Sequence, residues 1–435
     1  MSAERRSRPV DQNTSLLFIL LDRSFGDLIH MIRAGRLEKS ERGPLSWDFV
    51  ITLTILMIFG LIMLFSASYT SGYYNYSGDV YHFIRAQTKY AIVGFVVMFA
   101  ISALNYRALH YLTGILYSIT LVLLAVVLVM PTDVDGFHRW FSLGGVSFQP
   151  SEIAKFAAIL WVADQANLRY ERRSALMDGI GRTVLPLLPL LGLLLLEPHK
   201  SATLLIILII GVMLLCGGCG GFWVLPAGGV SGAAMWYYLM SKQDYTQERL
   251  GGVWGLTPSD TANMGWQTKQ GLYAISSGGL LGLGIGNSRQ KHQWLPYAEN
   301  DFIFSIVCEE LGFLGAVALI VLFGFLIVQG IRISLNAPDY FGSMLGIGIT
   351  AQIALQVFCH IGVNTALIPN TGISLPFFSS GGTSLLMLLA EMGVLLSISR
   401  AGNARIQAEK RQKQAELSRR MSRGGPRTTY RRTVN

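Results

Sequence analysis

The feature that most constrains this chain is a series of apolar runs, many of them near 20 residues long, that recurs between short polar breaks. A helix needs about 20 predominantly apolar residues to cross the hydrocarbon core of a bilayer. Apolar residues make up 51% of the 435 residues and charged residues only 14%. The charges gather at the two ends and in short breaks, leaving no stretch long enough for a separate soluble domain. The sequence therefore predicts an all-α polytopic membrane protein.

The apolar runs divide into ten predicted transmembrane helices. A polar turn at residues 197–203 interrupts a run that is too long for one crossing, so we divide that run into two helices. The longest polar interval, residues 241–300, becomes a large loop between the seventh and eighth helices. The predicted spans are residues 49–68, 90–104, 110–130, a fourth helix from Pro150 to about Asp164, 184–196, 204–215, 222–240, 302–328, 344–367 and 384–397.

The distribution of basic residues predicts the orientation, because Lys and Arg favour the cytoplasmic side of a membrane. With both termini in the cytoplasm, cytoplasmic segments hold 25 of the 35 Lys and Arg residues. The first 46 residues do not resemble a cleaved signal peptide, so we expect the first span to act as the insertion signal. The predicted parts are a basic cytoplasmic tail (1–46), a ten-span membrane domain (47–399) and a basic, disordered cytoplasmic tail (400–435). The polar segments on the outer face are then 136–155, 197–203, 241–301 and 369–384.

Neither the net charge nor the cysteines indicate a different class of protein. The net charge of +9 follows the predicted topology, so no nucleic-acid partner is expected. Cys216, Cys219, Cys308 and Cys359 lie in or beside apolar runs, which argues against an extracellular disulfide framework. The first two have C-x-x-C spacing but no second ligand pair, and we interpret them as part of a turn of small residues.

The four outer segments also carry spaced motifs in a recognisable order. They contain GFHRW with QPSEIAK, an EP turn, WQTKQGLYAISSGGLLGLGIGNSRQK with NDFIFSIVCEELGFLG, and PNTGISLPFFSSGGTS. Together with the ten spans, these motifs resemble the SEDS family (shape, elongation, division and sporulation), the FtsW, RodA and SpoVE group, over about residues 45–400. The resemblance implies a glycosyltransferase that polymerises lipid II into peptidoglycan at the outer face of the bacterial cytoplasmic membrane. It also implies a class B penicillin-binding protein as partner.

Within the family, the spacing from NSRQK to NDFIF and the long basic tails look more like FtsW than RodA. This likeness implies septal wall synthesis in cell division, with other divisome membrane proteins as partners. RodA-like elongation and SpoVE-like sporulation are the alternatives. One departure concerns the turn after the fifth span, where many members have EPD and this chain has Glu197, Pro198 and His199. A neutral imidazole cannot replace a carboxylate, so we carry no acid role onto His199.

Asp301 is the candidate catalytic base. Polymerising lipid II requires the 4-hydroxyl of an acceptor sugar to attack the anomeric carbon of a donor, with a lipid pyrophosphate as leaving group. Such a reaction needs a base and a group that neutralises the departing charge. Asp301 stands at the mouth of the eighth span as this base, or as ligand of a divalent cation such as Mg or Mn. The alternative is that Asp301 only caps the helix.

Four cations are candidates to hold the pyrophosphate, since charge-assisted bonds to phosphate are strong. Arg139 and Lys155 match family motifs, whereas for Arg289 and Lys291 anchoring to lipid headgroups is an equal alternative. Glu152 lies three residues before Lys155, and the two side chains are also expected to neutralise each other. The candidate substrate-binding residues are Arg139, Trp140, Gln149, Ser151, Glu152, Lys155, Glu197, Gln267, Arg289, Gln290, Lys291, Glu309, Ser379 and Ser380.

Several of these candidates follow from helix geometry and from glycine patterns. Glu309 lies about two turns below Asp301 on a similar face, and we expect it to line the same cavity. Glu310 points to the opposite side and is expected to pack through a polar partner. The glycine run 278–286 has no preceding strand, which excludes a dinucleotide fold; a flexible loop beside the substrate fits better. Ser379 and Ser380, with nearby backbone amides, form a candidate anion site.

Two other function classes remain open at the level of sequence. Polar residues within spans also mark transport paths, which makes a lipid II flippase or transporter the main rival. The absence of a visible inverted repeat and the outer position of the polar groups weigh against it. A non-catalytic division scaffold is the second rival, with structural acids and tails that recruit partners.

Overall fold

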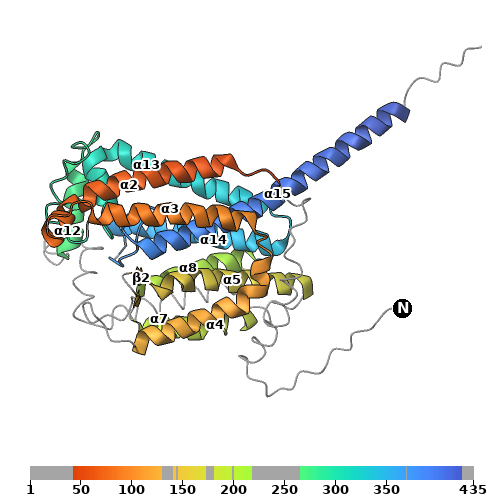
Figure 1. The fold of residues 1–435 in the computed structure, drawn as a ribbon, viewed down its shortest axis with the longest axis horizontal. Helices are drawn as coiled ribbons and strands as arrows, with labels where there is room; N and C mark the ends of the chain where they lie inside the picture. Colours follow the sequence, from red (N-terminus) through yellow and green to blue (C-terminus); the bar gives the residue numbers. More distant parts are fainter. Residues whose placement is uncertain are drawn as a thin grey trace, which may run out of the picture.

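Long apolar helices make up nearly all of the structure (Figure 1). The computed structural model describes residues 43–129, 141–143, 146–172, 181–197, 200–217, 265–368 and 370–423. Its elements are α2 (Trp47–Asn75), α3 (His82–Ala103), α4 (Ala108–Val129), β1 (Phe141–Leu143), β2 (Val146–Phe148), α5 (Pro150–Arg172), α7 (Leu187–Leu196), α8 (Lys200–Cys216), α12 (Trp266–Ser277), α13 (Ile303–Leu335), α14 (Tyr340–Asn364) and α15 (Gly382–Arg423). The predicted seventh span and the N-terminal tail up to residue 42 lie outside the described residues.

Six of the described helices are long and apolar enough to cross a membrane, namely α2, α3, α4, α13, α14 and α15. The helices α7 and α8 are also apolar but shorter, with 10 and 17 residues. These helices make the chain a multi-pass membrane protein. The predicted class is thus confirmed, with a short antiparallel hairpin of β1 and β2 added just before α5. The count of ten spans includes residues beyond the described ones.

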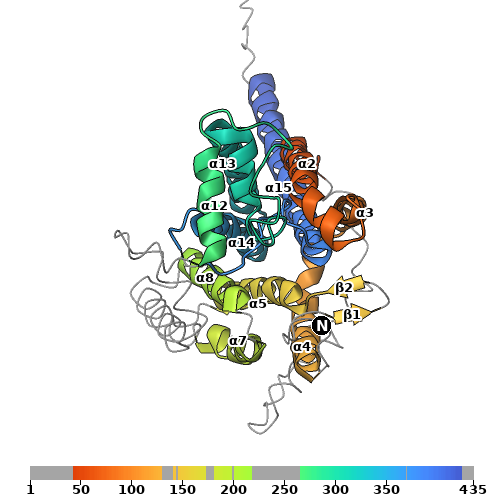
Figure 2. The same cartoon turned by 90° about the vertical axis from the view of Figure 1, so that its left-hand side faces the viewer.

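The helices pack in two groups on either side of α14. On one side α15 packs along α3, and α13 packs against α2 and α14. On the other side lie α4, α5, α7 and α8, with α5 and α8 against α14 (Figures 1 and 2). We call the end of the bundle where α13 begins and α14 finishes the Asp301 end. The segment before α15 enters the core there, because the buried ring of Phe378 packs edge-on against Phe59 at a centroid distance of 5.3 Å.

The predicted disorder from residue 400 onward is wrong for residues 400–423. The helix α15 continues to Arg423 and projects from the bundle in Figure 1. This extension is rich in Ala, Gln, Glu, Lys and Arg, which are strong helix formers. Since α15 is already formed in the bundle, lengthening it avoids the unfavourable nucleation step.

The predicted loop at residues 241–300 contains a helix, α12, which the sequence analysis missed. Its inner face is polar and small, with Thr268, Gln270, Gly271 and Ala274 buried. Such a face has no apolar periodicity by which a helix is usually recognised. This face is buried against α13 and α14, and Gly271 closely approaches Phe302 at the start of α13.

The glycine run after α12 is bonded to the backbone of α13, in contrast to the predicted flexible loop. Leu283 N donates to Glu309 O at 3.0 Å, and Phe313 N donates to Gly279 O at 2.9 Å. At this crossing α13 is kinked at Gly312, whose φ of 67° is favourable only for glycine. The predicted span from residue 302 is therefore interrupted after its third turn.

Candidate active site

Three hydrogen-bond donors, from the end of α14 and the segment before α15, hold the loop that carries Asp301. Phe302 occupies the N-cap position of α13, so Asp301, the residue before it, stands outside the helix. The side chain of Phe302 makes no capping bond. Three consecutive backbone carbonyls, ending with that of Asp301, each accept a hydrogen bond. Ser380 N donates to Glu299 O (2.9 Å), Ser379 Oγ donates to Asn300 O (2.6 Å) and Asn364 Nδ2 donates to Asp301 O (3.0 Å). The end of α14 and the segment before α15 thus fix the backbone position of Asp301.

Ser379 and Ser380, predicted to bind substrate, serve this loop in different ways. Ser379 is buried, and its hydroxyl also accepts from Leu375 N at 2.8 Å. Ser380 contributes its backbone N–H instead of its side chain. Gln87 of α3 makes two hydrogen bonds to the segment before α15: it donates to Ser379 O at 3.1 Å and accepts from Gly381 N at 3.2 Å. Gln87 was not predicted, because it lies in the polar stretch before the predicted second span and no motif marks it.

The carboxylate of Asp301 faces the turn at Gly372. A Cβ atom on Gly372 would lie 3.3 Å from Asp301 Oδ2, and Gly372 has a φ of 67°. The turn is linked to α12, because Gly372 N donates to Asn370 and Asn370 Nδ2 donates to Gln267 Oε1 at 3.2 Å. Gln267, a predicted site residue, therefore lies in the network around Asp301.

A second acid lies two residues before Asp301. The side chain of Glu299 is buried and accepts a hydrogen bond from Ser71 Oγ, at the end of α2, at 3.1 Å. Burial raises the pKa of Glu299 above its usual value, opposed by the hydrogen bonds that it accepts. The sequence analysis missed Glu299, although its place in the AENDF motif was a visible signal.

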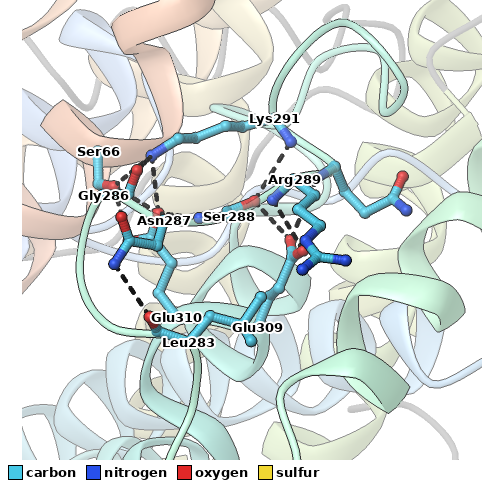
Figure 3. Close-up of polar contacts among 10 residues, drawn as sticks. Ser66, Leu283, Gly286, Asn287, Ser288, Arg289, Lys291, Glu309 and Glu310 are labelled. Carbon is cyan, nitrogen blue, oxygen red and sulfur yellow. Dashed lines mark hydrogen bonds and ion pairs between the residues drawn. The ribbon is translucent and has the colours of Figure 1, made fainter.

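The NSRQK segment, residues 287–291, folds onto the two acids of α13 (Figure 3). Glu309 accepts from Arg289 N at 2.9 Å and from the hydroxyl of Ser288. Glu310 accepts from Lys291 Nζ at 2.9 Å and from the hydroxyl of Ser66. Both acids are fully buried. The polar partner predicted for Glu310 is therefore confirmed, and Glu309 is bound to the segment in place of lining a cavity.

Lys291 does not present its ammonium group to the surface, contrary to our expectation for a pyrophosphate ligand. Its Nζ atom donates to Glu310, to Gly286 O at 2.7 Å and to Ser66 Oγ at 3.1 Å, and the residue is 6% exposed. A buried carboxylate needs such a partner, because an uncompensated buried charge is strongly destabilising. Arg289 is exposed, and Gln290 is half-buried.

The residues at the start of α5 form an internal polar group. Lys155 Nζ lies 2.8 Å from Glu152 Oε2 and both side chains are buried, so the alternative of mutual neutralisation is observed. Ser151 is also buried, Gln149 is half-buried just before α5, and Glu197 is buried at the end of α7. The predicted candidates Arg139 and Trp140, and also His199, lie outside the described residues.

Protein ligands for a metal ion are not gathered in the described part of the chain. Among those residues, no group of three or more His, Cys, Asp or Glu side chains is placed to hold one. The described cysteines Cys216, Cys308 and Cys359 are free thiols.

Comparison with known proteins gives one family. Residues 46–404 match the family FtsW/RodA/SpoVE, described as cell cycle proteins. Stage V sporulation protein E of Bacillus subtilis is 36% identical over 356 residues, which are 81% of this chain and 95% of that one. The probable peptidoglycan glycosyltransferase FtsW of Trichlorobacter lovleyi is 34% identical over 358 residues, 81% and 93% of the two chains.

Solved structures agree with this result. The rod shape determining protein RodA of Thermus thermophilus is 28% identical, with a TM-score of 0.61 over 82% of this chain and 97% of that one. A chain from a peptidoglycan synthase complex is 25% identical, with a TM-score of 0.67 over 82% and 98%. The chain belongs to the FtsW/RodA/SpoVE family of cell cycle proteins.

Proposed function

We propose that the chain is an inverting peptidoglycan glycosyltransferase that polymerises lipid II into glycan strands. Several relatives carry the name of that activity, and a structural neighbour comes from a peptidoglycan synthase complex. The observation that carries the proposal is the loop of Asp301, whose three consecutive carbonyls are held by donors from α14 and the segment before α15. A base that must meet a hydroxyl in one geometry needs such a fixed support.

In this proposal Asp301 accepts the proton of the acceptor 4-hydroxyl as the new glycosidic bond forms. The lipid pyrophosphate leaves from the opposite face of the donor sugar, which inverts the anomeric centre. Arg289 is the exposed cation of the NSRQK segment and is assigned to the departing charge. The Asp301 end is assigned to the outer face of the bacterial cytoplasmic membrane, with both termini in the cytoplasm.

The partner is proposed to be a class B penicillin-binding protein, and the setting the division septum with other divisome membrane proteins. The FtsW relatives support division, but relatives named for sporulation and for rod shape belong to the same family. Imaging a fluorescent fusion in growing cells separates these roles. A septal band supports division, whereas a signal along the side wall supports elongation.

A lipid II flippase is the second candidate, because the buried charges of α5 and α15 are typical of transport paths. The test incubates the purified protein and its penicillin-binding partner in detergent with labelled lipid II. Only an enzyme makes long glycan strands without a membrane gradient. Unchanged lipid II under these conditions would exclude the polymerase.

A further inference from the structure

A cluster of polar side chains is buried inside the bundle between α5, α14 and α15. Besides the ion pair of Glu152 and Lys155, it contains Gln352, which donates to Glu391 Oε2 at 2.9 Å. All four residues are at most 7% exposed. The helix α5 packs against both α14 and α15, which places the two pairs in one cluster.

The packing of α5 against α14 sets the register of this cluster. The helices run antiparallel, since Tyr170 near the end of α5 stacks on Tyr340 at the start of α14 with a centroid distance of 4.6 Å. Farther along, Ile159 packs closely on Gly348. From this contact towards the Asp301 end, each step of about four residues back along α5 and forward along α14 brings two polar residues opposite each other. These pairs are Lys155 with Gln352, and Ser151 with Gln356.

Four buried oxygen atoms in this cluster have no hydrogen-bond partner among the described residues. They are Ser151 Oγ, Gln352 Oε1, Gln356 Oε1 and Glu391 Oε1. The residues are 1–2% exposed. Three of the four atoms are acceptors only, and buried acceptors without a donor are costly.

The charges of the cluster, like its unpaired acceptors, favour a bound positive charge. If both carboxylates are ionised, Glu152 and Glu391 carry two negative charges against the one positive charge of Lys155. Of the ionisable groups on the neighbouring described elements, Asp164 pairs with His110, and Glu310 pairs with Lys291. On α3, Arg85 pairs with Asp79 and Lys89 is exposed. His360, one turn beyond Gln356, bonds through Nδ1 to Ile373 O at 2.7 Å. One negative charge is therefore uncompensated, which is strongly unfavourable inside a protein.

We propose that these four oxygens form a buried site for one monovalent positive charge, either a sodium ion or a proton held with ordered water. Both ligands accept oxygen lone pairs, and both neutralise the excess charge. Lone pairs of carboxylate, amide and hydroxyl oxygens suit a hard cation better than a soft metal. Glu391 is the central ligand, because it supplies both the charge and a free oxygen.

The test measures the thermal unfolding temperature of the full-length protein in detergent. Sodium is replaced by N-methyl-D-glucamine at constant ionic strength in one arm, and the pH is varied at fixed sodium in the other. A ligand that binds only the folded state raises Tm in a concentration-dependent way. The variant is Glu391→Gln, which removes the charge but keeps an acceptor. The matched control is Glu416→Gln, an exposed position on the extension of α15.

A sodium site predicts that sodium raises the Tm of the wild type and of Glu416→Gln, with no shift in Glu391→Gln. A proton site predicts no effect of sodium and a Tm that falls as the pH rises, again lost only in Glu391→Gln. If Glu391→Gln does not fold, Gln356→Leu replaces it as the test variant, because it removes one oxygen ligand without changing the charge. It should reduce the Tm shift in the arm, sodium or pH, in which the wild type responds. The proposal is overturned if the wild type responds in neither arm, or if the folded variant responds as the control does.

Discussion

The buried ion pair of Lys291 and Glu310 shows how single residues hold the NSRQK segment in place. We expect Lys291→Met to destabilise the protein by about 3–5 kcal/mol, because it leaves the buried carboxylate of Glu310 without a cation. The free energy of unfolding in denaturant is the measurement. The neighbouring exposed Arg289→Met is the control and should change stability by less than about 0.5 kcal/mol. Equal effects of the two variants would contradict the buried pair.

The loop of Asp301 gives a second prediction. Ser379→Ala removes the hydroxyl that joins Asn300 O to Leu375 N. One hydrogen bond is worth roughly 1 kcal/mol, so we expect the polymerisation rate to fall about fivefold with the fold intact. Ser380→Ala is the control, because Ser380 contributes only its backbone N–H to the loop. If both variants lose activity equally, the hydroxyl of Ser379 does not position Asp301.

Sequence reasoning identified Asp301, Glu309 and Glu310 but did not foresee that Lys291 pairs with Glu310. The reason is distance along the chain: Ser66, which shares the ammonium group with Glu310, stands 225 residues before Lys291. A motif shows which residues are adjacent in sequence, and not which distant helix completes their hydrogen bonds. Gln87 escaped notice for the same reason, since its partners Ser379 and Gly381 lie almost 300 residues later.

At the scale of elements, the kink in α13 marks the place where the glycine run after α12 crosses this helix. Gly312→Ala should destabilise the protein by at least about 1–3 kcal/mol, because it combines a left-handed backbone with a steric clash. The added Cβ would lie 2.3 Å from Gly282 N. Gly324→Ala in the same helix is the control, since nothing lies within 4 Å of its Cβ. That substitution should stabilise α13 by up to about 1 kcal/mol. An unchanged thermal unfolding temperature for Gly312→Ala would contradict the close contact of Gly312 with the glycine run.

The described helices show which elements a pattern can predict. Long apolar runs predicted α2, α4, α13 and α14, because hydropathy is strong along each run, with ends that differ by up to seven residues. The kink at Gly312 was not predicted, since a single glycine inside a helical pattern does not by itself indicate a break. The helix α12 and the extension of α15 were missed because their residues are polar, and only packing or continuation from a formed helix makes them helical.

For the whole molecule, the distribution of basic residues predicts that the Asp301 end faces outwards. A single cysteine at Tyr297, which is exposed near Asp301, should react with a membrane-impermeant thiol reagent in intact spheroplasts. A cysteine at the exposed Leu417 should react only after the membrane is opened. The protein without an added cysteine measures the background from its own thiols. If only Leu417→Cys is labelled in intact spheroplasts, the orientation is the reverse of the predicted one.

The central claim is that Asp301 is the base of a lipid II polymerase. Its most direct test compares the wild type with Asp301→Asn, each purified with its penicillin-binding partner and given labelled lipid II. The wild type is expected to make long glycan strands, and the variant to make none while unfolding at a similar temperature. Glycan strands formed by folded Asp301→Asn at the wild-type rate would contradict the assignment.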